Sequence, residues 1–126
     1  MKYGVIKENH LFVKSYTKGK KAICKRVAVF VLEDRHARFL QKSHPEKKKI
    51  NRVGVSATKK VGGAVERNRC KRLIREAWRQ VEKRYPLVKG KLIVLSAREE
   101  CAAAKMQDVL KDLTYAVKKL GLTENT

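Results

Sequence analysis

Acidic residues are scarce in this chain. Its 126 residues include 12 Asp and Glu against 32 Lys and Arg, which gives a formal net charge of +20 at pH 7. A folded domain with that charge repels itself unless a polyanion neutralises the field. The composition therefore predicts a polyanionic partner, and nucleic acid is the partner that we expect.

Cysteines and long apolar runs are also scarce. Cys24, Cys70 and Cys101 are odd in number and lack C-x-x-C spacing, which argues against a disulfide framework and a structural zinc site. The histidines form no H-E-x-x-H pattern, so we expect no metal site in the protein. No apolar run approaches the roughly 18 residues that span a membrane. The N-terminal segment lacks the pattern of a secretory signal, and we therefore expect a cytoplasmic protein without a membrane partner.

The length of the chain fits one domain, residues 1–126. Apolar residues at helical spacing predict a short helix over 9–18, and β-branched runs predict strands over 22–32 and 52–57. The segment 33–51 between these strands is too long for a tight turn. It predicts a long mobile connection.

Helical spacing returns after Gly62 and Gly63 and continues from Val65 to Tyr85. A continuous apolar run at 91–97 predicts another strand, and the pattern over 99–120 predicts a last helix. The order is helix, strand, strand, helix, strand, helix. It predicts the α+β class, with helices packed on a central, mainly antiparallel sheet.

The helix that follows the two glycines carries a basic stripe. Its buried face is expected to bear Leu73, Ala77 and Val81. The residues almost opposite are Asn68, Arg72, Arg75 and Arg79. Arginine offers a planar fork of donors that matches phosphate oxygens. The alternative is a solvated face, but such a face normally intersperses acids, and Glu76 is the only acid from Arg67 to Arg79.

Aromatic side chains and catalytic groups are less informative. Phe12 and Tyr16 lie one helical turn apart, where they either stack on unpaired bases or pack in the core. The sequence leaves both readings open. A nuclease acting by itself needs clustered carboxylates or a histidine pair, and neither is visible. We therefore expect no catalytic residue in the protein.

Residues 52–79, RVGVSATKKVGGAVERNRCKRLIREAWR, closely resemble the protein subunit of bacterial ribonuclease P. The motifs that carry the resemblance are the Arg67-Asn68-Arg69 segment, the basic helix after it, and the V-G-x-S-x-x-K-K pattern at 53–60. A weaker similarity extends to Phe12-x-x-x-Tyr16-x-x-Gly19 and to residues 92–98.

The resemblance implies an endoribonuclease that removes the 5′ leader of precursor tRNA, in which an RNA subunit performs the hydrolysis. Mg²⁺ would be held by that RNA and by substrate phosphates, and no obligate protein partner is implied. The residues implied to bind the RNA subunit are Arg67, Asn68, Arg69, Lys71, Arg72, Arg75 and Arg79. The residues implied to bind the leader, in a cleft between the first helix and the sheet, are Phe12, Tyr16, Lys59 and Lys60. The family also implies a left-handed crossover between the parallel strands that flank the basic helix.

Two departures from the family pattern concern the leader side. The 33–51 segment is longer than in many members, and Glu8 stands where a basic residue is often found. Two other classes remain as alternatives at this point: a ribosomal protein and a DNA-binding module. The stripe favours RNA over DNA because Asn68 is its only obvious base reader.

Overall fold

The computed structural model describes residues 3–5, 9–33 and 51–123. Its helices and strands are β1 (Tyr3–Val5), α1 (Asn9–Lys18), β2 (Lys20–Ile23), β3 (Val27–Glu33), β4 (Asn51–Ala57), α3 (Ala64–Arg84), β5 (Lys91–Ala97), the 3₁₀ helix η1 (Glu99–Ala103) and α4 (Met106–Lys119). Glu8 and residues 34–50, on which part of the sequence-based predictions fell, lie outside the described residues.

The strands form one five-stranded sheet in the order β1-β4-β5-β3-β2. The α+β class and the order of the predicted elements are confirmed. The sheet is mixed rather than mainly antiparallel, because β4 pairs in parallel with both β1 and β5, while β3 pairs antiparallel with β2 and β5. The chain returns from β4 to β5 through α3, a connection long enough for neighbouring parallel strands. The left hand of this crossover stays a prediction from the resemblance.

The single strand predicted over 22–32 is instead a hairpin of β2 and β3. Its turn is closed by a hydrogen bond of 3.0 Å from the Cys24 amide to the Val27 carbonyl. The carboxylate of Asp112 on α4 accepts a second hydrogen bond of 2.8 Å from the Arg26 amide. A distant residue thus helps to fix the turn, which is why the local apolar pattern did not predict it.

The last predicted helix is also divided, into η1 and α4. The break consists of Ala104 and Lys105, and at the start of α4 the Asp108 carboxylate accepts a hydrogen bond of 3.1 Å from the Lys105 amide. This hydrogen bond holds the pKa of Asp108 below its ordinary value. Gly121 follows α4 with a φ of +69°, a left-handed conformation that glycine adopts readily at the end of a helix. Among the described residues, no helix combines the length and the apolar character needed to cross a membrane.

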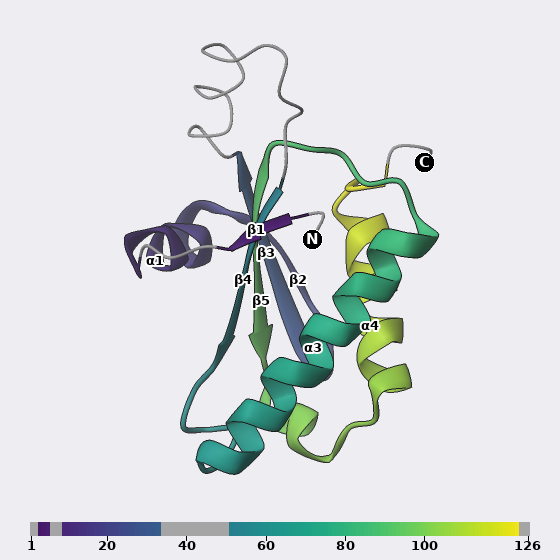
Figure 1. The fold of residues 1–126 in the computed structure, drawn as a ribbon. Coiled ribbons are helices and arrows are strands. Elements are labelled where there is room, and N and C mark those ends of the chain that lie inside the picture. The colour runs from purple at the N-terminus through teal and green to yellow at the C-terminus, as the bar shows by residue number, and fades with distance from the viewer. Residues whose placement is uncertain (1–2, 6–8, 34–50, 124–126) are drawn as a thin grey trace.

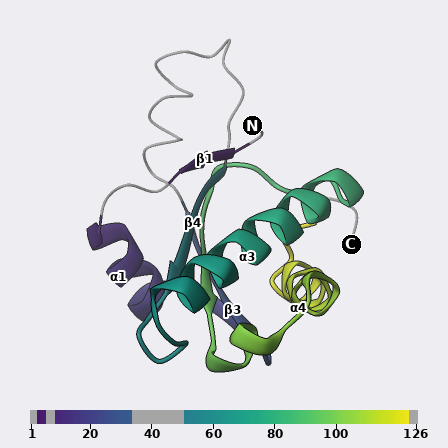
Figure 2. The same cartoon turned by 60° about the horizontal axis from the view of Figure 1, so that its bottom comes forward.

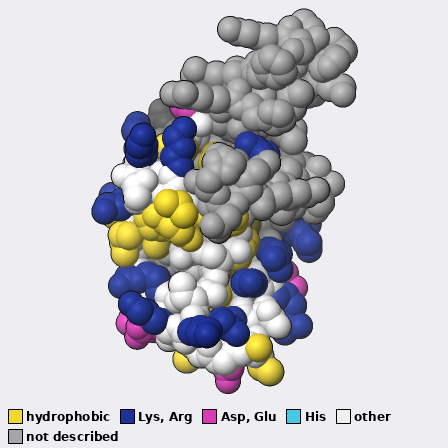
Figure 3. All heavy atoms as spheres, turned by 90° about the vertical axis from the view of Figure 1, so that its left-hand side faces the viewer, with side chains coloured by type: hydrophobic (Ala, Val, Ile, Leu, Met, Phe, Trp, Pro, Cys, Tyr) yellow, Lys and Arg dark blue, Asp and Glu magenta, His cyan; other side chains and the backbone are white. Residues whose placement is uncertain are grey.

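The two faces of the sheet hold different helices, with α3 and α4 on one side and α1 on the other (Figures 1 and 2). Side chains that alternate along β5 explain why both faces of the sheet are covered. Ile93 and Leu95 join the core beneath α3 and α4, whereas Leu92 and Val94 pack with Phe12 of α1. On the α1 side, hydrophobic side chains gather in a patch bordered by Lys and Arg (Figure 3).

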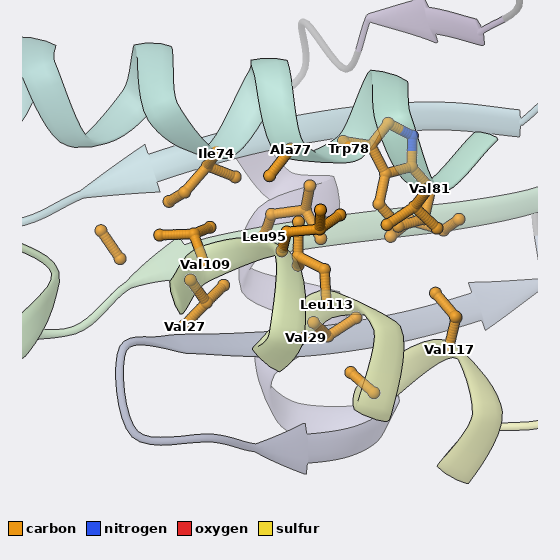
Figure 4. Packing of buried hydrophobic residues seen from close by; sticks show 14 of the residues in the cluster. Val27, Val29, Ile74, Ala77, Trp78, Val81, Leu95, Val109, Leu113 and Val117 are labelled. Carbon is orange, nitrogen blue, oxygen red and sulfur yellow. The ribbon is translucent and has the colours of Figure 1, made fainter. Parts of the chain in front are cut away.

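The main core lies between the sheet and the α3–α4 pair (Figure 4). Trp78 and Ile74 from α3 meet Leu113 from α4 and Val29 from β3, and all four are almost completely buried. Each such side chain contributes about 1.5–3 kcal/mol on burial. This packing fixes the orientation of α3 and therefore decides which of its residues face outward.

Candidate nucleic-acid interface

The turn from β4 into α3 presents two lysines at one end of the sheet. It is closed by hydrogen bonds from the Val61 amide to the Thr58 carbonyl and from the Gly62 amide to the Lys59 carbonyl, at 3.0 and 3.2 Å. Gly62 has a φ of +148°, where a side chain is strained. Lys59 and Lys60 are both exposed on this turn.

The outward face of α3 is basic, as predicted. Asn68, Arg72, Arg75 and Arg79 are all exposed. The residues buried on the opposite side are Cys70, Ile74, Ala77, Trp78 and Val81. The predicted buried face is correct for Ala77 and Val81, but Leu73 is only half-buried because the face centres on the row through Ile74 and Trp78. We call the four exposed residues the α3 stripe.

The three residues of the Arg67-Asn68-Arg69 segment have different surroundings. Asn68 is exposed and Arg67 is half-buried, as is Lys71 in the next turn. The guanidinium of Arg69 instead donates hydrogen bonds to two backbone carbonyls, that of Ala102 at 3.0 Å through Nη1 and that of Ala104 at 2.8 Å through Nη2. The segment therefore contributes one side chain to the interior connection with η1.

Two thiols lie beside this connection. Cys70 on α3 and Cys101 on η1 are fully buried. Burial and the neighbouring Cys70 thiol raise the pKa of Cys101 to about 12. Because both thiols are fully buried, we interpret them as packing groups rather than nucleophiles.

The two aromatic residues predicted for the leader differ in exposure. Phe12 is half-buried against Leu92 and Val94, which favours its packing role. Tyr16 is 39% exposed. Its hydroxyl lies 2.8 Å from Oγ of Ser56, and its ring meets that of Phe30 edge to face at 4.8 Å between centroids.

A depression of about 570 Å³ lies where β4 and β5 end, next to the β4–α3 turn. Its cationic lining residues are Lys25, Lys59, Lys60 and Arg98. Its acidic lining residues, Glu99 and Glu100, come from η1. Glu100 forms an ion pair of 3.6 Å with Lys25. We call this hollow the β4–β5 depression.

The β4–β5 depression adjoins the surface around Tyr16. Ser56, the partner of Tyr16, donates a hydrogen bond of 3.1 Å to Oγ of Ser96, which itself lines the depression. Sequence reasoning missed Ser96, Lys25 and Arg98 as members of this site. Only strand pairing brings them together, because the β2–β3 turn and the end of β5 are distant in sequence.

Sequence reasoning also missed two apolar residues on the α1 side. Val13 on α1 is 54% exposed and Ile23 on β2 is 50% exposed. Ile23 faces this side because its neighbour Ala22 points into the main core. Alternation along β2 was the available signal, but the strand had not been separated from β3.

The α3 stripe and the two aromatic residues predicted for the leader, Phe12 and Tyr16, thus belong to helices on opposite faces of the sheet. The α3 stripe faces away from the sheet on one side, and α1 covers the other (Figure 2). The β4–α3 turn joins the two, since Lys59 and Lys60 precede α3 and line the β4–β5 depression.

Comparison with known proteins identifies the family of this chain. The family model described as ribonuclease P matches residues 2–121. The ribonuclease P protein component of Bacillus cereus (strain B4264) is 32% identical over 117 residues, which cover 93% of this chain and 90% of that protein. The structure of the Staphylococcus aureus RNase P protein is 27% identical, with a TM-score of 0.70, and the match covers 95% of this chain and 97% of that one. The Thermotoga maritima RNase P protein, 22% identical with a TM-score of 0.62 over 82% of this chain and 86% of that one, shares the fold. The chain belongs to the ribonuclease P protein family, which forms the protein component of an endoribonuclease that processes tRNA.

Proposed function

We propose that this protein binds the RNA subunit of ribonuclease P through the basic side of α3 and the 5′ leader of precursor tRNA through the α1 side. In this way it assists endonucleolytic 5′ maturation of tRNA. The observation that carries the proposal is the α3 stripe, in which Arg72, Arg75 and Arg79 are exposed. Side chains at this spacing follow a phosphate backbone, because a helical turn advances by about 5.4 Å.

Binding by the stripe is electrostatic. Each phosphate that a cationic side chain neutralises releases condensed counterions, so the affinity depends steeply on salt. Folding of the RNA brings its phosphates close together, where they repel one another. A rigid basic face reduces this repulsion because it places positive charge beside the phosphates. The protein is therefore expected to reduce the Mg²⁺ concentration that the RNA subunit requires.

The leader is proposed to follow the α1 side toward the β4–β5 depression. The partly exposed ring of Tyr16 can stack on a base of the leader. Lys59 and Lys60, in the β4–β5 depression, can bind phosphates farther along the leader. Stacking on a tyrosine is tolerant of base identity, since every base has a π face. This tolerance suits a subunit that handles different leaders.

Hydrolysis is proposed to belong to the RNA subunit, with Mg²⁺ held by that RNA and by substrate phosphates. Within residues 3–5, 9–33 and 51–123, no three His, Cys, Asp or Glu residues are grouped to hold a metal ion. The contribution that we assign to the protein is positioning of the leader. The free thiols of Cys24, Cys70 and Cys101 favour a reducing compartment, and we place the function in the cytoplasm.

Reconstitution with the host's ribonuclease P RNA tests the proposal. The rate of precursor tRNA cleavage is measured against Mg²⁺ concentration for the RNA alone, the protein alone and the two together. We expect the protein alone to be inactive and the mixture to reach half its maximal rate at lower Mg²⁺ than the RNA alone.

Two triple variants distinguish the stripe from net charge. Replacing Arg72, Arg75 and Arg79 by alanine should return the Mg²⁺ requirement toward that of the RNA alone. Replacing Lys111, Lys118 and Lys119 of α4, which removes the same charge, should change it less. Cleavage by RNA-free protein, or equal effects of the two triple variants, would contradict the proposal.

A further inference from the structure

One arginine of the Arg67-Asn68-Arg69 segment is turned into the protein. Arg69 is half-buried, and its fork spans the carbonyl oxygens of Ala102 and Ala104 at 3.0 and 2.8 Å. These carbonyls belong to the end of η1 and to the residue that follows it. The last carbonyls of a helix lack partners within the helix, and arginine is well suited to satisfy them.

We infer that Arg69 is a positioning residue that locks η1 against α3, and that its contribution to RNA binding passes through this lock rather than through a phosphate contact. The inference rests on the proposed function, since it assigns a role within the same interface. It separates Arg69 from Arg72, whose side chain is exposed on the same helix.

The lock connects the two proposed RNA surfaces. On one side it holds the first turns of α3, from which the α3 stripe begins. On the other side it holds η1, whose Glu99 and Glu100 form a wall of the β4–β5 depression. Movement of η1 would therefore displace that wall relative to Lys59 and Lys60 on the neighbouring turn.

The contacts on the inner side of this connection are of a different kind. Cys101 lies beside Cys70, and the Ala104 amide donates a hydrogen bond of 3.0 Å to the Cys101 carbonyl. The hydrogen bond closes the last turn of η1, and the two thiols form an apolar contact between η1 and α3. The two charge-assisted hydrogen bonds of Arg69 add a polar link from α3 to the end of η1, and such bonds are about twice as strong as neutral ones.

The test compares Arg69→Ala with Arg72→Ala in binding to the ribonuclease P RNA over a range of salt concentrations. Hydrogen exchange of each free protein is followed by mass spectrometry. For Arg72→Ala we expect the slope of log affinity against log salt to flatten by about 0.7 to 0.9, with exchange unchanged. For Arg69→Ala we expect about tenfold weaker binding, a slope that changes by less than half as much, and faster exchange confined to residues 98–105.

Circular dichroism first establishes that each variant is folded at the temperature of the assay. If Arg69→Ala is unfolded, Arg69→Gln takes its place, because it removes the charge and retains an N–H donor. A slope that flattens as much as in Arg72→Ala, with unchanged exchange at 98–105, would overturn the inference and leave Arg69 as a phosphate contact. Unchanged affinity, with altered exchange alone, would also overturn it, because the lock would then not serve RNA binding.

The same measurements separate failure of the inference from failure of the proposed function. If Arg72→Ala and Arg69→Ala both bind the RNA like the unmodified protein, the proposed interface itself is wrong. If Arg72→Ala behaves as expected and Arg69→Ala does not, the proposed interface is supported and the positioning role of Arg69 is wrong.

Discussion

The hydroxyl oxygen of Tyr16 on α1 lies 2.8 Å from that of Ser56 on β4. The same tyrosine ring rests edge-on against Phe30 of β3. The ring is thus held from two sides, yet 39% of the residue remains exposed. A fixed aromatic ring with an open part is a preorganised surface for a base, because the side chain gives up little entropy when the base binds.

Replacing Tyr16 by alanine should therefore affect the leader and hardly affect the fold. We expect precursor tRNA to bind the reconstituted holoenzyme more weakly by about 1–3 kcal/mol, the scale of one base–aromatic contact. Mature tRNA, which lacks the leader, should bind as before. Equilibrium binding of the two tRNA forms, together with a thermal melt of the variant, measures both effects.

Tyr115→Ala is the matched control, since Tyr115 is a 57% exposed tyrosine on α4, away from α1. It should leave both tRNA affinities unchanged. Tyr16→Phe retains the ring and removes only the hydrogen bond to Ser56. Equal weakening of precursor and mature tRNA by Tyr16→Ala, with a large fall in Tm, would show that the ring is a core residue.

The Arg72 side chain should make a phosphate contact with the RNA subunit. Arg72→Ala is expected to flatten the salt dependence of RNA-subunit binding by about 0.7 to 0.9 in log–log slope for each phosphate that the variant no longer neutralises. Lys111→Ala removes one exposed charge from α4 and serves as the control, with a smaller expected change. An Arg72→Ala slope equal to that of Lys111→Ala would remove Arg72 from the interface.

Asp112 should stabilise the β2–β3 turn. Its carboxylate accepts hydrogen bonds from the Arg26 amide at 2.8 Å and from the Arg26 guanidinium at 3.3 Å, and the residue is 9% exposed. Asp112→Ala leaves a half-buried amide donor without its partner, which costs about 1–3 kcal/mol. Denaturant unfolding measures this destabilisation, and Asp112→Asn, which keeps an acceptor, should be destabilised less. Equal stability of the alanine variant and the unmodified protein would contradict the assignment.

The three thiols should differ in reactivity. Burial raises the pKa of the Cys101 thiol to about 12, so at pH 8 it stays protonated and should resist iodoacetamide while the protein is folded. Cys70 is equally buried and should resist as well, whereas the half-exposed Cys24 should be modified first. Mass spectrometry of peptides before and after denaturation measures the order. Rapid modification of Cys101 in folded protein would contradict the buried packing of η1.

The raised pKa of Cys101 also has a consequence for stability. The folded state retains the thiol proton above pH 9.0, where an unfolded thiol begins to lose it. The contribution is complete below pH 9.0 and is lost as the pH rises toward about 12. The free energy of unfolding should therefore fall more steeply between pH 9 and pH 11 in the unmodified protein than in Cys101→Ala. Parallel curves for the two proteins would refute this linkage.

Local signals in the chain are enough to predict most of its helices and strands. Gly62 and Gly63 before a 3.6-residue apolar period predicted α3, and the apolar pattern over 99–120 predicted the helical segment that contains α4. The same periodicity predicted that Asn68, Arg72, Arg75 and Arg79 face outward, because the buried and exposed sides of a helix follow from residue spacing alone. The RNR motif and the basic helix also sufficed to indicate the family.

The remaining features depend on contacts between distant segments. Residues 22–32 read as one apolar strand, and their division into β2 and β3 is supported by Asp112, which lies far along the chain. The β4–β5 depression required the parallel pairing of two strands to bring Ser96 and Arg98 beside Lys59. The arginines of the basic helix look equivalent in the sequence. The position of η1 gives the Arg69 guanidinium two carbonyl partners, while Arg72 in the next turn remains exposed. Residue spacing within a helix sets the direction of a side chain. The partner that the side chain meets depends on how the distant segments pack.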